Sequence, residues 1–282
     1  YFQANLSGAE AIILYSVYDI ATTLLEVPSG YFSDRIGRRL TLMLSAVCSV
    51  LGCLALAFGG SFAVYALGQS LIGAGSAFKS GTDSALLYEA LDATGRAEEI
   101  EAQELRVWRF TLAGFAVSAV SGGAMAMWSA TLPFYATASA FAIAAILVAL
   151  MAEPPRAADG TDSVRAQIAT LKAALLHPVL AWLFSLTVLM YGFSHLPFVF
   201  GQPFIRTSLD QLGLAAEAPL VSGVVTCLMM LLSVVASLVA PRLRLLLGLP
   251  VLLLCAFGLQ IALVAALAVS TSVLVIGVLL LR

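Results

Sequence analysis

The sequence predicts an all-α polytopic membrane protein. Hydrophobic residues fill 61% of its 282 positions, charged residues fill only 11%, and the mean hydropathy is +1.01. Long apolar segments recur along the chain, and most charged residues fall in the short connections between them. A soluble globule with so few charges would lack a water-compatible surface, so we expect the chain to lie in a lipid bilayer. The net charge of -2 gives no indication of nucleic-acid binding.

The apolar segments have the length of membrane-spanning helices, each of which needs roughly 20 mostly apolar residues. A ninth, partial segment begins near Ser272 and ends with the sequence at Arg282. The opening residues YFQANLSG read as the end of an earlier span or as the scar of a tag, so we interpret the chain as a fragment truncated at both ends. The eight complete predicted spans are residues 8–29, 40–58, 62–90, 105–127, 130–151, 178–205, 217–240 and 246–268.

The basic residues predict how these spans are oriented. Eleven of the fourteen Lys and Arg residues lie in alternate connections on one side of the membrane, and Arg206 is an exception on the other side. Because basic loops are retained inside the cell, we expect the first side to be cytoplasmic. The eleven residues are Arg35, Arg38, Arg39, Arg96, Arg106, Arg109, Arg156, Arg165, Lys172, Arg242 and Arg244.

The longest polar stretch, residues 153–177, divides the chain. Its Pro, Gly, Asp and Arg content predicts a cytoplasmic linker rather than a span. Residues 1–152 are then an N-terminal helical bundle whose first helix is missing, and residues 178–282 are part of a second bundle. Two bundles joined by a central cytoplasmic loop are one of the parallel-repeat architectures of transporters.

A charged segment, GYFSDRIGRR at residues 30–39, connects the first two complete spans. Its pattern of Gly, three residues, Asp-Arg, one residue and Gly-Arg-Arg resembles the cytoplasmic loop signature of the major facilitator superfamily. The segments EVPSG (26–30) and SGTDSALLYEAL (80–91) are similar to those of its bacterial members. The resemblance implies an incomplete two-bundle transporter fold in a bacterial inner membrane. The six signature residues are Gly30, Asp34, Arg35, Gly37, Arg38 and Arg39.

Each signature residue type has a physical use in such a loop. Gly30 and Gly37 permit a tight reversal and a close approach of helices. Asp34 can accept hydrogen bonds from helix N-termini or pair with an arginine of the opposing bundle. The arginines either form a charge lattice that holds one conformation, or anchor the loop to anionic lipid. We interpret Asp34 as a conformational residue, because a topology signal needs no acid.

A superfamily signature of the fourth helix is incomplete here. The segment GQSLIGAGSAF keeps Gly73 and Gly75, but Gln69 stands where the superfamily often has an arginine associated with proton coupling. This departure weakens the inference of the usual proton route. Arg282, eleven residues into its partial span, is a further candidate because a charge near the bilayer centre is costly and tends to face a polar cavity.

A signature of the fifth helix in proton-driven exporters is also degenerate. The segment GFAVSAVSGG keeps Gly114, Gly122 and Gly123 but has Ser118 and Ala119 where the exporters have Gly-Pro. The small residues still allow close helix packing. The missing proline removes the kink associated with antiporters, so export is only the preferred direction.

An acidic residue inside the first complete span is a candidate for proton or cation binding, because ionisable residues in membranes are costly. Asp19 lies eleven residues before Gly30, about 16 Å along a helix, and so close to mid-membrane. Tyr15, Thr23 and Glu26 extend a polar stripe along the same helix face. The alternative is an Asp19 that only hydrogen-bonds to a neighbouring helix.

Three charges mark the inner end of the predicted span 62–90. Lys79 and Asp83 have the i, i+4 spacing of an ion pair on one helix face. We interpret Asp83 and Glu89 as inner-gate partners of Arg35 or Arg38, against the alternative of solvated charges at a helix end. The following cluster, residues 98–109, is interpreted as a solvated cytoplasmic helix end.

The second half contributes one polar segment, LMYGFSHLPFVFGQPF. It places Tyr191, His195 and Gln202 on a helix interrupted by Pro197 and Pro203, and such discontinuous helices can line substrate cavities. His195 is a candidate proton acceptor, although a lone His is more often a packing residue. Two His and four scattered Cys give no metal-ligand spacing, so no metal site is expected.

These features favour a secondary transporter that works by alternating access, with proton-coupled export of small organic or amphipathic compounds as the preferred activity. The sequence has no phosphate-binding Gly loop with Lys, no HExxH and no nucleophile elbow, so neither an enzyme nor a cofactor is expected. One alternative is a facilitator or symporter for a nutrient such as a sugar or organic acid; another is a non-transporting sensor or scaffold. Expected partners are the bilayer, a small-molecule substrate and protons, but not nucleic acid, and a monomer is expected.

Overall fold

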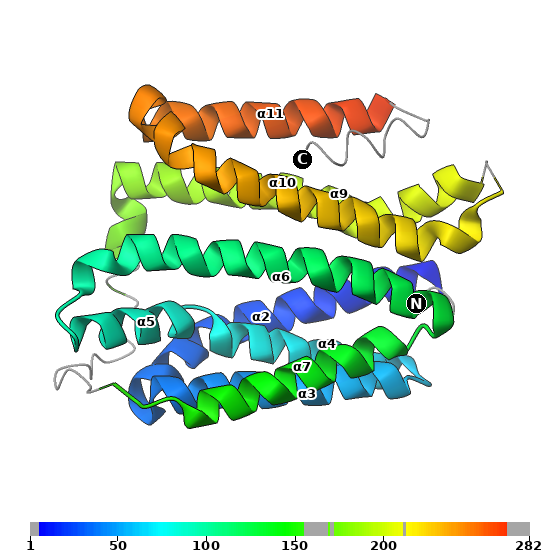
Figure 1. Cartoon of the computed structure of the whole chain (residues 1–282), viewed down its shortest axis with the longest axis horizontal. Helices are drawn as coiled ribbons and strands as arrows, with labels where there is room; N and C mark the ends of the chain where they lie inside the picture. The colour runs from blue at the N-terminus through cyan, green and yellow to red at the C-terminus, as the bar shows by residue number, and fades with distance from the viewer. Residues whose placement is uncertain (1–5, 155–168, 170–171, 211–212, 270–282) are drawn as a thin grey trace. The chain divides into compact units, whose positions relative to one another are not determined.

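The computed structural model describes residues 6–154, 169, 172–210 and 213–269. Its regular elements within these ranges are all helical (Figure 1), as the sequence predicts. They are α2 (Gly8–Ile36), α3 (Arg38–Phe58), α4 (Phe62–Lys79), α5 (Thr82–Asp92), η1 (Ala97–Glu99), α6 (Ile100–Trp128), α7 (Leu132–Leu150), α9 (Pro178–Asp210), η2 (Ala215–Glu217), α10 (Ala218–Leu247) and α11 (Leu249–Val269).

Six helices of the described ranges are long and apolar enough to cross a membrane. They correspond to α2, α3, η1 with α6, α7, α10 and most of α11. Each of the eight predicted complete spans has a helical counterpart, but two of them are not among the six. The predicted span 62–90 is divided between α4 and α5, and the apolar part of α9 covers the shorter range Pro178–Ser194.

Two compact units divide the chain, residues 1–104 with 129–165 and residues 105–128 with 166–282. Most of α6 therefore groups with the second half of the sequence. The predicted linker 153–177 lies mostly outside the described residues, so the boundaries of the two bundles stay a prediction. The partial ninth span and Arg282 also lie outside, as do the side chains of His195 and Gln202.

The signature segment is more helical than the sequence predicts. Helix α2 begins with a capping box between Ser7 and Glu10 and continues to Ile36, so Gly30 lies inside it. A Cβ added at Gly30 would meet nothing within 4 Å, and the predicted role of Gly30 in a tight reversal is therefore wrong. The reversal occurs at Gly37 alone, whose φ of 107° is a conformation that favours glycine.

Helix α4 is the centre of the first unit, where it packs against α2 and α3, and α3 in turn packs against α7 (Figure 1). Small residues allow this close approach. A Cβ added at Gly52 would lie 2.8 Å from the Gly68 carbonyl oxygen, and one added at Gly73 would lie 2.7 Å from that of Tyr18. The Ser45 hydroxyl donates to the carbonyl oxygen of Gly75 at 2.6 Å, which joins α3 to α4 through a hydrogen bond that apolar lipid cannot replace.

A break at Ser80 and Gly81 separates α4 from α5. The Ser80 N–H donates to the Ser76 carbonyl as the last bond of α4, and the Ala85 N–H donates to the Gly81 carbonyl as a first bond of α5. Gly81 has a φ of 71°, in the left-handed region. The single span predicted for residues 62–90 is therefore wrong, because the helix geometry cannot continue through a residue with this φ.

The second unit includes a close antiparallel pairing of α6 and α10. A Cβ added at Gly123 would lie 2.7 Å from the Pro219 carbonyl oxygen and 3.4 Å from the Gly223 Cα atom. At the other end of the pair, the Arg109 guanidinium donates to the Ser237 hydroxyl at 3.3 Å. Arg109 lies fourteen residues before Gly123, and Ser237 lies fourteen residues after Gly223. The two contacts, about 21 Å apart along each helix, therefore share one register.

Candidate functional site

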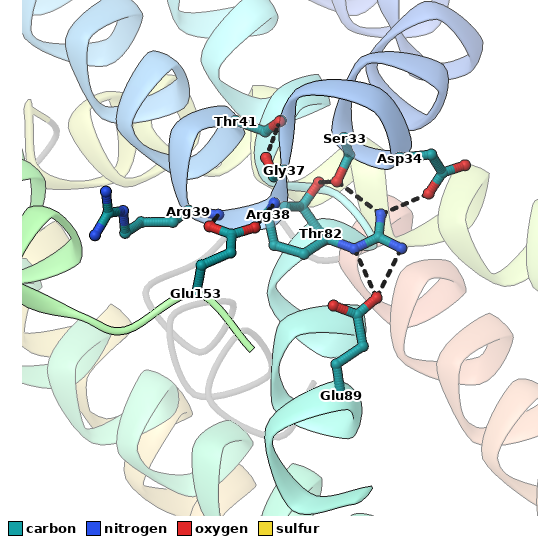
Figure 2. Close-up of polar contacts among 9 residues, drawn as sticks. All are labelled: Ser33, Asp34, Gly37, Arg38, Arg39, Thr41, Thr82, Glu89 and Glu153. Atoms are coloured by element: carbon teal, nitrogen blue, oxygen red, sulfur yellow. Dashed lines mark hydrogen bonds and ion pairs between the residues drawn. The ribbon is translucent and has the colours of Figure 1, made fainter. Parts of the chain in front are cut away.

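The signature arginine Arg38 is the centre of a polar cluster (Figure 2). The turn at Gly37 places Arg38 in the first turn of α3, where its guanidinium returns to the last turn of α2. There the Nη1 atom donates to Asp34 Oδ1 at 2.7 Å and to Ser33 Oγ at 2.8 Å. The Nε and Nη2 atoms both lie 3.0 Å from Glu89 Oε1 of α5. One guanidinium thus joins three helices, and we call Arg38, Asp34, Glu89, Ser33 and Thr82 the Arg38 centre.

Buried hydroxyls complete this centre. The Thr82 hydroxyl donates to Ser33 Oγ at 3.1 Å, and both side chains belong to residues that are only 2% exposed. The Arg38, Glu89 and Asp34 side chains keep 20%, 25% and 34% of their surface exposed. Water therefore reaches the ion pairs, which lowers the free energy needed to separate the charges.

A carboxylate from a distant segment caps α3. Glu153 accepts the Arg38 N–H on Oε1 at 2.7 Å and the Arg39 N–H on Oε2 at 3.1 Å (Figure 2). The Arg39 guanidinium also donates to the carbonyl oxygen of Met151 at 3.0 Å. Because the N-cap residue Gly37 has no side chain to offer, Glu153 supplies the acceptors that a Ser or Asp would give.

Glu153 is not among the site residues predicted from the sequence, where it falls at the start of the predicted linker. One signal was present in the sequence. A helix that begins directly after glycine without Ser, Thr, Asp or Asn at its start needs acceptors from elsewhere in the chain. The sequence could not show which of its acidic residues takes this position, because Glu153 lies 115 positions from Arg38.

The family model described as the Major Facilitator Superfamily matches residues 1–281. The chain belongs to the Major Facilitator Superfamily. Members of this superfamily are membrane transporters, and the apolar helices agree with a multi-pass protein that lies in a lipid bilayer and binds small-molecule substrates. Comparison with curated proteins finds no match.

In this superfamily member, the two predicted acidic partners of the signature arginines, Asp83 and Glu89, pair with different residues. Glu89 is paired with Arg38, as one of the predicted alternatives has it. Asp83 instead lies 3.7 Å from Lys79, the predicted i, i+4 pair, although these two residues stand on either side of the helix break. Arg35 lies with its guanidinium carbon 4.8 Å from the centre of the Tyr31 ring.

Asp34 is paired within its own signature. Its Oδ1 atom accepts a hydrogen bond from Arg38 at 2.7 Å, an i, i+4 pair that spans the Gly37 turn. The N-terminus of α3 is capped by Glu153 and not by Asp34. The predicted pairing of Asp34 with an arginine of the opposing bundle stays a prediction.

Thr22, the neighbour of the predicted stripe residue Thr23 in α2, contacts α4. The Thr22 hydroxyl donates to the Tyr18 carbonyl at 2.9 Å and lies 3.3 Å from the Gly73 carbonyl oxygen of α4. Asp19 lies on the same helix and is partly buried, and its proposed role in proton binding stays a prediction. Gln69, at the position of the superfamily arginine, is buried in α4 and 8% exposed.

Glu26, the fourth residue of the predicted stripe, has a defined partner. Its Oε1 atom accepts the Ser80 hydroxyl at 2.5 Å. Ser80 is the residue at which α4 ends, so this bond joins α2 to the break between α4 and α5.

The glycines of the degenerate fifth-helix signature differ from one another. A Cβ added at Gly114 or Gly122 would meet nothing within 4 Å, whereas Gly123 is in close contact with α10. Close packing is therefore found at one of the three predicted positions. Arg109, predicted to lie in a solvated cluster, is instead partly buried and donates to Ser237 of α10.

Glu98, Glu101 and Arg106 of the cluster do lie at the surface. Just before the cluster, Arg96 donates to Glu99 at 2.8 and 2.6 Å, which raises the pKa of the Arg96 guanidinium, so it stays charged in the turn after α5. Among the residues that the structure describes, no group of three His, Cys, Asp or Glu side chains could hold a metal ion.

Proposed function

We propose that this superfamily transporter works by alternating access and exports small organic or amphipathic compounds in exchange for protons. The Arg38 centre is the observation that carries the proposal. Its contacts join the consecutive helices α2 and α3 to α5, which is distant in the sequence, through charges that remain partly exposed. Because its charged groups are paired in this arrangement and are also open to water, such a cluster can exchange between a formed and a broken state.

In this proposal the Arg38 centre is the cytoplasmic gate of a bacterial inner-membrane protein. The formed state holds Glu89 of α5 against the start of α3 and so keeps this end of the first unit closed. Separating the guanidinium from Glu89 would leave two charges to hydration, which the exposed 20–25% of their side chains makes possible. Substrate or proton binding then has to supply only a small free-energy difference between the states.

Protons are the proposed coupling ion, with Asp19 as the residue that binds them. A carboxylate in a membrane-spanning helix is costly when charged and therefore exchanges protons readily as its surroundings change. Asp19 lies near the middle of α2, the helix that carries Ser33 and Asp34 of the Arg38 centre at its C-terminal end. A change of charge at Asp19 can therefore reach the gate along one continuous helix.

The experiment that tests this function measures proton movement in proteoliposomes. Full-length protein is reconstituted with a pH-sensitive dye inside the vesicles and challenged with a panel of cationic and neutral compounds. Compound-dependent proton flux that Asp19→Asn abolishes would support coupled transport through this carboxylate. The matched control is Asp92→Asn at the exposed end of α5, which should leave the flux unchanged. Flux that persists in Asp19→Asn would remove Asp19 from the coupling mechanism.

A nutrient facilitator or symporter is the second candidate. The observation that favours it is the residue pair Ser118 and Ala119 inside α6, where exporters of the superfamily have Gly-Pro. Accumulation of a radiolabelled sugar or organic acid inside vesicles, without movement of the compound panel, would favour import. The absence of both proton flux and accumulation with every compound would favour a sensor. The observation that supports a sensor is the buried Gln69 in place of arginine.

A further inference from the structure

The break between α4 and α5 is a joint between two differently attached segments. Helix α4 is fixed to α2 in the membrane-spanning part, where the Thr22 hydroxyl lies 3.3 Å from the Gly73 carbonyl oxygen. Helix α5 is fixed to the end of α2 through Thr82 and to the start of α3 through Glu89, both of the Arg38 centre. The two attachments are independent, because no continuous helix connects them across Gly81.

Gly81 allows the joint to change its angle. A Cβ at this position would meet nothing within 4 Å, so the glycine is required by its φ of 71° and not by lack of space. A residue with open space around it can change its backbone dihedrals without displacing neighbours. The angle of the joint is therefore set by the contacts of α5 and by those of the residues beside Gly81.

Three contacts lie beside the joint. Lys79 and Asp83 bridge it at 3.7 Å, but their side chains are 61% and 45% exposed, and such a pair contributes little. The buried Thr82 hydroxyl donates to Ser33 of α2 at 3.1 Å. The Ser80 hydroxyl donates to the Glu26 carboxylate at 2.5 Å, the distance of a charge-assisted hydrogen bond, although both residues are exposed. Both of these hydrogen bonds tie the joint to α2, one on each side of Gly81.

We propose that Glu26 is a positioning residue for the Arg38 centre, which holds Ser80 so that α5 presents Thr82 and Glu89 to α2 and α3. This inference rests on the proposed function, because it names the contact that sets the geometry of the proposed gate. When the Glu26–Ser80 bond is broken, α5 swings about Gly81 as one segment. Thr82 and Glu89 then leave their partners together, while the packing of α4 on α2 and α3 is kept.

Hydrogen exchange measured by mass spectrometry on the full chain in lipid nanodiscs tests this role. Ser80→Ala and Glu26→Ala should raise exchange of the amides of residues 82–92 by about two- to tenfold, the effect of losing one hydrogen bond. Amides of residues 62–79 should keep their wild-type exchange. Glu26→Gln, whose amide oxygen can still accept the Ser80 hydroxyl, should restore most of the protection.

A matched control removes an equivalent contact elsewhere on α2. The Ser7 hydroxyl donates to the Glu10 carboxylate at 2.7 Å, and Ser7→Ala should leave the exchange of residues 82–92 unchanged. If Glu26→Ala does not fold, Ser80→Ala gives the same comparison with the loss of a single oxygen atom. The double variant Glu26→Ala with Ser80→Ala should exchange no faster than either single variant, because both remove the same bond.

Two results would overturn the inference. Equal increases in residues 62–79 and 82–92 would mean that Glu26 supports the whole helix pair. No increase in 82–92 would mean that Glu26 positions nothing, and if proton flux is lost as well, Glu26 is assigned to coupling instead. Because the exchange measurement needs no substrate, its outcome is independent of whether the proposed export is found.

Discussion

Removal of the Glu153 carboxylate should weaken the first unit at the start of α3. Glu153 accepts two backbone N–H groups, those of Arg38 and Arg39, at 2.7 and 3.1 Å. In Glu153→Ala these two donors lose their protein acceptor, and Gly37 offers no side chain in its place. The substitution also removes a negative charge from the positive end of the helix dipole.

The magnitude follows from the capping geometry. Loss of an N-cap side chain costs about 0.5–2 kcal/mol, and the charge at the helix N-terminus adds about 0.3–1 kcal/mol. The partial exposure of Glu153 lets water replace some of this, so we expect a loss of about 1–2 kcal/mol. For a chain of this size that corresponds to a fall in melting temperature of about 2–8 °C. Glu153→Gln keeps one acceptor and should fall between the variant and the wild type.

The assay is thermal unfolding in detergent. Unfolding is detected by chemical labelling of the Cys53 thiol, which belongs to a residue only 3% exposed in the folded protein. The matched control is Glu217→Ala, because Glu217 is the N-cap residue of α10 but makes no side-chain cap hydrogen bond. Glu217→Ala removes only the charge at a helix N-terminus, about 0.3–1 kcal/mol, and should therefore lower the melting temperature by less than Glu153→Ala does. A fall in Glu153→Ala that is no larger than in Glu217→Ala would refute the capping role.

Three further predictions concern packing, register and the ion pair. Gly30→Ala should raise the melting temperature by about 1–3 °C, since alanine favours a helix and the position is open. Gly73→Ala should lower the melting temperature, because a Cβ would lie 2.7 Å from an α2 carbonyl oxygen, and equal shifts in the two variants would contradict this packing. Ala119→Cys should form a disulfide with native Cys227 under mild oxidation, because the shared register of α6 and α10 places positions 119 and 227 opposite each other. The Cys227→Ser control should stay reduced, and an Ala119→Cys chain that also stays reduced would contradict that register. Glu89→Gln should lower the melting temperature by about 1–3 °C and raise hydrogen exchange in α5, and unchanged exchange there would show that the ion pair does not hold this helix.

Local patterns in the sequence were sufficient for the helices themselves. Apolar runs of span length predict where the helices lie, because a lipid-exposed backbone must satisfy its own hydrogen bonds. They do not predict every end, since α2 and α10 each extend seven residues beyond the predicted span and the span 62–90 is divided. The i, i+4 spacing of Lys79 and Asp83 predicts their contact, because the two residues lie within one helical turn of sequence. The signature from Gly30 to Arg39 predicts the superfamily that the family model matches.

What the sequence by itself determined is therefore the membrane class, the helices and the family. Only the tertiary structure decided that Glu153 caps α3, that Arg38 pairs with Glu89, and that Glu26 binds Ser80. These contacts join positions 51 to 115 residues apart, and every span contains apolar faces on which several packings are possible. Hydropathy fixes which residues enter the bilayer, but the register between helices depends on where small residues let two backbones approach, which is a property of the pair and not of either segment.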